Sequence, residues 1–252
     1  MLNKTKKLVI ANWKMKLNHQ QSIDLAKQLV RQYKSNDNLE VVICPNFASL
    51  QAVGEIIKNS NFKLGAQDVF YHDIGSYTGE ISPAVLAELG CGYVLVGHSE
   101  RRKLGESDDD INRKVQAIVK NDMVPVICVG ETFEEFQEHK TDVVIIQQVT
   151  KALEDIKLRP GQKLVLAYEP VWVVGSGQAV EHNVVEHIVQ IILYTAIDLD
   201  PQLADKFTVI YGGSVDAANV NDFIIGNLST GVIVGTESLK VKSFIDILEK
   251  IQ

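Results

Sequence analysis

The stretch VPVICVG, residues 124–130, is apolar at consecutive positions and rich in β-branched side chains. A continuous apolar run of this length is typical of a strand that is covered on both faces. Seven further runs share this character: KLVIAN (7–12), LEVVIC (39–44), FKLGAQ (62–67), YVLVG (93–97), KLVLAYE (163–169), FTVIYGG (207–213) and GVIVG (231–235). Segments with helical spacing separate them, for example Val184, Ile188 and Ile191. The sequence therefore predicts strands and helices in alternation.

Alternating strands and helices indicate right-handed crossovers and a parallel sheet. Eight such units in 252 residues match an α/β barrel, which commonly uses about 250 residues as one domain. An open, doubly wound sheet would favour a GxGxxG loop after the first strand, but the chain continues as Asn12-Trp13-Lys14. We therefore predict one closed eight-stranded (β/α)8 barrel over residues 1–252.

Composition narrows the class of partner. The chain has 25 Lys and Arg against 32 Asp and Glu, a net charge of −7, and 46% hydrophobic residues. These values predict a soluble globular protein and argue against nucleic acid or an anionic membrane as the main partner. No run approaches the about 20 apolar residues that cross a bilayer. Three cysteines without CxxC spacing favour reduced thiols, so we expect a cytoplasmic protein.

Polar residues follow several of the predicted strands. In a parallel barrel the carboxyl ends of the strands meet on one face, where active sites lie. The first strand ends in Asn12 and Lys14, the fourth in His98, and the sixth in Glu169. Together these groups suit the transfer of a proton between carbon atoms. A carboxylate can move the proton, a neutral imidazole can polarise a carbonyl, and a cation can balance the negative charge that develops.

Glycine-bearing turns follow the last two strands, at Gly212-Gly213-Ser214 and at Gly235-Thr236. Bare backbone amides in these two loops are a common phosphate cradle in barrels. We therefore expect a phosphorylated small substrate.

Two other loops stand out. Residues 171–177, VWVVGSG, place an apolar patch directly after Glu169, as expected of a lid that closes over substrate. Residues 68–78, DVFYHDIGSYT, form an unusually long, aromatic-bearing loop. We expect this second loop to dock on a partner subunit.

Five motifs in chain order, ANWKM, TGEISPAVL, GHSERR, YEPVWVVGSG and YGGSV, closely resemble the triosephosphate isomerase family. The resemblance runs from about Leu8 to Leu239 and implies a TIM barrel. It also implies reversible interconversion of dihydroxyacetone phosphate and D-glyceraldehyde 3-phosphate through an enediolate, in glycolysis and gluconeogenesis, without metal or cofactor. In this pattern Glu169 moves the carbon-bound proton, His98 is the neutral electrophile, Lys14 supplies positive potential and Asn12 bonds a substrate oxygen.

The resemblance further assigns supporting roles. Ser99 and Glu100 would hold His98 and Lys14, and Tyr211 would brace the closed lid. The loop at 68–82 would make a homodimer and carry Tyr77 and Thr78 to the neighbour's site. The phosphate would be gripped by the backbone amides of Gly175, Ser214, Gly235 and Thr236.

Four residues depart from the family pattern. Thr236 stands where the family usually has a second glycine, and a β-branched residue tolerates positive φ poorly, which places the phosphate grip in question. A backbone amide can point at phosphate whatever its side chain, so we expect function to survive. Asp68 replaces the usual asparagine after GAQ, Lys16 the usual asparagine after NWKM, and Thr230 an aspartate before the last strand. These three changes place affinity in question more than chemistry.

Alternative functions on the same barrel would require different residues at the strand ends. A second cofactor-free phosphosugar isomerase on the same barrel is the nearest alternative. A Schiff-base aldolase would want a lysine at the end of a late strand, where this chain has Glu169, and a metal-dependent epimerase would want several His and Asp at strand ends. A non-catalytic binding protein would not need base, electrophile and lid together.

Overall fold

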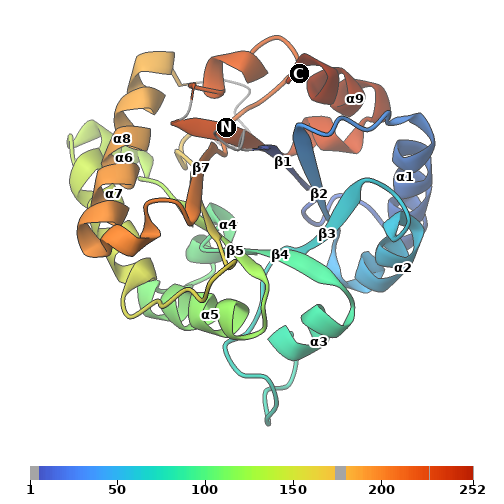
Figure 1. Ribbon diagram of the computed structural model, residues 1–252, viewed down its shortest axis with the longest axis horizontal. Coiled ribbons are helices and arrows are strands. Elements are labelled where there is room, and N and C mark those ends of the chain that lie inside the picture. The colour runs from blue at the N-terminus through green and yellow to red at the C-terminus, as the bar shows by residue number, and fades with distance from the viewer. Residues whose placement is uncertain (1–5, 174–179, 227, 252) are drawn as a thin grey trace.

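The structure is a computed structural model that describes residues 6–173, 180–226 and 228–251. Its centre is a closed barrel of parallel strands, in which each strand pairs with the next and β8 pairs with β1 (Figure 1). The strands are β1 (Lys7–Asn12), β2 (Leu39–Cys44), β3 (Phe62–Ala66), β4 (Cys91–Val96), β5 (Val124–Val129), β6 (Leu164–Tyr168), β7 (Phe207–Tyr211) and β8 (Ser229–Val234). The predicted barrel is confirmed, and the boundaries of its strands differ from the predicted runs by at most two residues.

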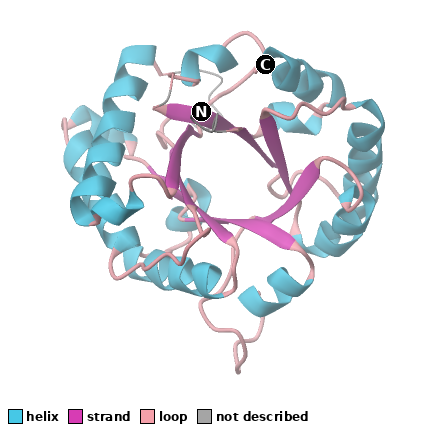
Figure 2. Cartoon of the chain, in the orientation of Figure 1, coloured by secondary structure: helices cyan, strands magenta, loops and turns pink. Residues whose placement is uncertain are grey.

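Helices form a ring outside the barrel (Figure 2). They are α1 (His19–Gln32), α2 (Phe47–Ile57), α3 (Pro83–Glu88), α4 (Ser99–Lys103), α5 (Asp108–Lys120), α6 (Phe133–Gln137), α7 (Thr141–Leu153), α8 (His182–Leu199) and α9 (Val241–Lys250). Short 3₁₀ turns are η1 (Pro201–Leu203), η2 (Val220–Phe223) and η3 (Thr236–Leu239). Within the described ranges, no helix is long and apolar enough to cross a membrane.

The strands are apolar at consecutive positions because both of their faces are buried. Val9 packs in the layer between the strands and the surrounding helices. Its neighbour Ile10 points into the barrel, where it packs with Leu95 and Ile210. Neighbouring side chains on a strand point to opposite faces, so each strand supplies both layers. This double burial explains why the runs show no alternation of apolar and polar residues.

The strand ladder continues past the last strand residues on the face that carries the polar groups. The Glu169 N–H donates to the Val129 carbonyl at 2.8 Å, and the Gly212 N–H donates to the Tyr168 carbonyl at 2.7 Å. These bonds fix the backbone of the loops immediately after β6 and β7. The side chain of Glu169 thus starts from a fixed backbone position.

The long loop at residues 68–82 projects from the barrel beside α3 (Figure 1). Its base is tied down by Asp68, whose carboxylate contacts Lys114 at 2.7 Å and Arg101 at 2.9 Å. Lys114 also binds Glu106, and both of these side chains are buried. Asp68 therefore completes a partly buried ionic cluster of two cations and two anions, in which the side chains of Lys114 and Glu106 are buried and that of Arg101 is partly exposed. The carboxylate of Asp68 faces this cluster and does not line the cavity described below. No contact in the structure therefore links Asp68 to the affinity for a ligand in that cavity.

Candidate active site

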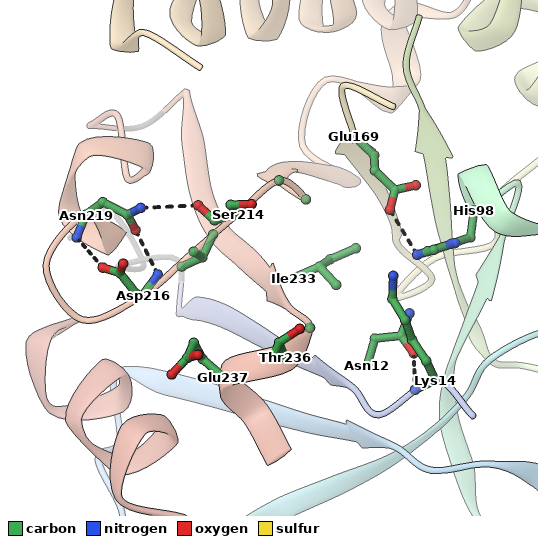
Figure 3. Close-up of a pocket in the computed structure, with 14 residues that line it drawn as sticks. Asn12, Lys14, His98, Glu169, Ser214, Asp216, Asn219, Ile233, Thr236 and Glu237 are labelled. Carbon is green, nitrogen blue, oxygen red and sulfur yellow. Dashed lines mark hydrogen bonds and ion pairs between the residues drawn. The ribbon is translucent and has the colours of Figure 1, made fainter. Parts of the chain in front are cut away.

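A cavity of about 460 Å³ lies at the carboxyl ends of the strands (Figure 3). It brings together the following predicted residues: Asn12, Lys14, His98, Glu169, Ser214, Gly235 and Thr236. Acid–base groups occupy one side of this cavity, and the glycine turns after β7 and β8 occupy the other. A substrate with a reactive carbon at one end and a phosphate at the other fits this division.

Glu169 is buried at the end of β6 and makes two polar contacts. Its Oε1 lies 2.9 Å from His98 Nε2, and its Oε2 accepts the Ser99 N–H at 3.0 Å. Ser99 was expected to hold His98 or Lys14, but its backbone holds the carboxylate of Glu169. The difference arises because Ser99 begins α4, and the first N–H groups of a helix have no partner within the helix.

His98 is the N-cap residue of α4, and its ring is almost fully buried. Its Nδ1 accepts the Glu100 N–H at 3.1 Å, so that nitrogen carries no proton. The proton of the neutral ring therefore lies on Nε2, which faces Glu169. The hydrogen-bond pattern assigns a neutral imidazole with a donor directed at the cavity, as expected for an electrophile.

Lys14 has a left-handed backbone with φ of +50°, an uncommon conformation for a lysine. Its N–H donates to Asn12 Oδ1 at 3.0 Å, and its Nζ contacts Glu100 at 2.8 Å. Burial alone would raise the pKa of Glu100, but the hydrogen bond and charge of Lys14, with His98 and Lys16 nearby, lower it below its usual value. Glu100 thus holds both His98 and Lys14, as the family pattern implies.

Gln67 was not among the predicted site residues. Its Nε2 donates to the carbonyl of Lys14 and to that of Cys44, each at 2.9 Å. A half-buried amide with two backbone partners supports the strained turn at Lys14. The only signal in the sequence was its place as the last residue of the third predicted strand, one residue beyond the observed end of β3.

The phosphate side is built from the turns after β7 and β8. A Cβ at Gly213 would lie 2.0 Å from the Tyr211 hydroxyl, so only glycine fits there. Gly235 has a φ of −88°, and Thr236 is not among the described non-glycine residues with positive φ. The sequence-based expectation of strain at Thr236 is therefore wrong, because this turn enters η3 and has no left-handed residue at that position.

Two acidic residues, Asp216 and Glu237, also line this cavity. Asp216 accepts the N–H groups of Ala218 and Asn219 at 2.7 and 3.0 Å. Hydrogen bonds from Lys240 and then Ser243 lower the pKa of Glu237. Both carboxylates are engaged by their own loops, which reduces their repulsion of an anionic ligand.

The predicted lid is described only at its beginning. Trp172 donates through Nε1 to Glu131 at 2.8 Å, and Ser214 donates to the carbonyl of Val173 at 3.2 Å. Gly175 lies outside the described residues. Tyr211 is buried, with its hydroxyl against Gly213, and burial raises its pKa to about 12. In this structure Tyr211 therefore supports the phosphate turn.

Tyr77 and Thr78 do not line the cavity of their own chain. The ring of Tyr77 stacks on His72 at 5.0 Å and lies 4.7 Å from Phe70. The loop is thus packed by its own aromatic residues while it projects from the barrel (Figure 1).

Comparison with known proteins agrees with this geometry. The family model described as triosephosphate isomerase matches residues 7–251. The chain is 37% identical over 245 residues to the triosephosphate isomerase of Dictyoglomus turgidum, covering 96% of this chain and 98% of that protein. It is 37% identical over 243 residues to that of Ligilactobacillus salivarius, covering 96% and 97%, and 36% identical over 245 residues to that of Streptococcus suis, covering 96% and 98%.

Proposed function

The chain belongs to the triosephosphate isomerase family, and we propose that Glu169, His98 and Lys14 together carry out the isomerisation of a triose phosphate. The enzyme interconverts dihydroxyacetone phosphate and D-glyceraldehyde 3-phosphate, a step of glycolysis and gluconeogenesis. The observation that carries the residue assignment is the contact of the Glu169 carboxylate with the Nε2 of a neutral His98 inside the cavity.

Glu169 is the base that acts on carbon. It removes a proton from C1 of dihydroxyacetone phosphate and returns it to C2, which leaves an enediolate between the two steps. In this structure both carboxylate oxygens of Glu169 are engaged, by His98 and by the Ser99 N–H. Substrate binding must therefore release Glu169, and the substrate oxygen takes over the hydrogen bond from His98.

His98 and Lys14 stabilise the charge that develops on the substrate oxygens. The Nε2 proton of His98 is donated to the carbonyl oxygen as it becomes an alkoxide, and it is then exchanged between the two oxygens. Lys14 Nζ supplies positive charge at the same end of the cavity, and Asn12 supplies a hydrogen-bonding amide. The imidazole is neutral before and after this exchange, because the proton that Nε2 gives to one substrate oxygen is replaced by the proton of the other oxygen.

The phosphate group binds across the cavity from Glu169. Ser214, Gly235 and Thr236 line that side of the cavity, which supports the proposal that their backbone amides, with that of Gly175, bind the phosphate. The start of the lid connects to this region through the bond from Ser214 to Val173. A closed lid excludes water and limits loss of phosphate from the enediolate.

The decisive experiment measures turnover of glyceraldehyde 3-phosphate by the wild type and by Glu169→Gln. Loss of the base should lower kcat by about 10²- to 10⁴-fold, and EDTA should change neither protein. Glu134→Gln, on the exposed side of α6, is the matched control. Unaltered turnover in Glu169→Gln would contradict the mechanism, and faster turnover of a four-carbon sugar phosphate would favour a different phosphosugar isomerase.

A homodimer is the proposed assembly. Met15 and Ile74 are 91% and 92% exposed, and Ile74 lies at the tip of the loop at residues 68–82. Both side chains offer apolar area that a partner subunit would cover. In the dimer this loop would carry Tyr77 and Thr78 to the neighbour's site. The three free, buried cysteines of the chain support a reducing, cytoplasmic location.

Light scattering tests the dimer. Ile74→Lys should shift the mass toward that of one 27.9 kDa chain and lower activity, most strongly on dilution. Tyr194→Lys, on α8 at another side of the barrel, places the same charge at an exposed apolar residue and should stay dimeric. Full activity of the wild type as a single chain would contradict this proposal.

A further inference from the structure

The indole of Trp172 is held from two directions just beyond the proposed base. Its Nε1 donates to Glu131 Oε1 at 2.8 Å. Its ring stacks on Phe136 of α6, with centroids 4.5 Å apart and an angle of 27° between the planes. Both contacts hold Trp172, which lies only three positions after Glu169 in the chain.

Glu131 provides a fixed acceptor for this indole. The residue is fully buried after β5, and its carbonyl accepts the Val171 N–H at 3.1 Å. The Tyr168 hydroxyl donates to the same carboxylate at 3.2 Å. Burial raises the pKa of Glu131 although these donors act against the rise. A buried carboxylate strongly favours keeping its donors, so the position of Trp172 Nε1 is well determined.

One hydrogen bond cannot determine the orientation of a ring. An indole that is held only at Nε1 can still swing about that point, and its backbone can move with it. The stacked ring of Phe136 restricts this motion, because offset aromatic faces attract each other beyond their apolar contact. The bond to Glu131 thus sets the position of the indole, and the stack with Phe136 sets its plane.

Phe136 and Phe133 offer a comparison within one short helix. Both rings are partly exposed, at 37% and 49%. Within the described part of the chain, Phe136 contacts another ring and no ring contact is found for Phe133. An exposed phenylalanine contributes little to stability by itself. The stack on Trp172 is therefore the contact that distinguishes Phe136 from Phe133.

We propose that Phe136 is a positioning residue for the isomerisation: its ring holds Trp172 against Glu131 and thereby fixes the segment Pro170–Val173 that follows the base. This inference rests on the proposed function, since that segment follows Glu169 directly at one end and meets Ser214 of the phosphate side at the other. A loosened indole would let the segment sample arrangements that grip phosphate less well.

Phe136→Leu, Phe136→Tyr and Phe133→Leu test this proposal. Leucine keeps apolar area but removes the ring, tyrosine keeps the ring, and Phe133→Leu is the matched control. Acrylamide quenching of tryptophan fluorescence reports on the indole directly, because the second tryptophan, Trp13, is only 1% exposed. We expect at least twofold stronger quenching in Phe136→Leu only, with an unchanged urea midpoint in all three.

The kinetic readout is turnover of glyceraldehyde 3-phosphate together with release of inorganic phosphate. Phe136→Leu should lower kcat/KM three- to tenfold, mainly through KM, and should raise phosphate release per isomerisation. Phe136→Tyr should restore both values. If Phe136→Leu matched Phe133→Leu in quenching and in phosphate release, the proposal would be wrong. An inactive wild type would instead contradict the proposed function, and the quenching comparison would still decide whether Phe136 holds Trp172.

Discussion

Gly130 lies directly after β5, where the backbone of Glu169 passes close to it. A Cβ built at Gly130 would be 1.9 Å from the Glu169 carbonyl oxygen and 2.6 Å from the carbonyl carbon. Ordinary contact between such atoms begins near 3.4 Å, so Gly130→Ala would force the peptide of Glu169 to move by about 1.5 Å. The obstacle is backbone, and no rotation of a side chain can relieve it.

The expected loss of activity follows from this displacement. The Glu169 N–H is bonded to Val129, so a shift of the peptide carries the carboxylate with it. A misplacement of about 1 Å can reduce a rate about 100-fold, because the reacting atoms leave their near-attack geometry. We expect kcat of Gly130→Ala to fall by about 100-fold or more. Overpacking should also lower the free energy of unfolding by about 1–3 kcal/mol.

The assay compares Gly130→Ala with Gly92→Ala, by steady-state turnover and by urea unfolding of each protein. Gly92 lies in β4, and the nearest atom to a Cβ built there is 4.0 Å away. Gly92→Ala should keep its kcat and be unchanged or slightly more stable. A folded Gly130→Ala protein with kcat within about threefold of the wild type would refute the link between this close approach and the position of the base.

Three further changes test other contacts. Lys114→Met leaves the buried Glu106 carboxylate without its cation, and it should lower the free energy of unfolding by about 3–5 kcal/mol in urea denaturation. The hydrogen bond from Lys120 lowers the pKa of Asp73 from 3.8, so its stabilising effect is present above pH 3.8 and is lost as the pH falls through the lower, folded-state pKa. Asp73→Asn should therefore lower the urea midpoint at pH 7, and a difference that persisted at pH 2 would contradict this assignment. Gln67→Leu removes the hydrogen bonds that Gln67 donates to the carbonyls of Lys14 and Cys44, and steady-state kinetics should show kcat reduced by about tenfold. A wild-type kcat would contradict the supporting role of Gln67.

Much of the fold could be predicted because its signals are local. Each strand is marked by an unbroken apolar run, because both of its faces are buried in the barrel. The residue types at the strand ends could also be predicted to meet, since parallel strands bring their carboxyl ends to one face. The expected strain at Thr236 was wrong because the backbone angles of a turn depend on the geometry of the next element, which here is η3.

The sequence by itself determined the order of strands and helices, the polar groups at the rim and the family of the chain. Only the tertiary structure decided which contacts those groups make. The ring of His98 meets the carboxylate of Glu169, and the turn at Lys14 is supported by Gln67. Bonds between residues far apart in the chain exist only once the barrel has closed, and their geometry depends on differences of less than an ångström that no local pattern encodes.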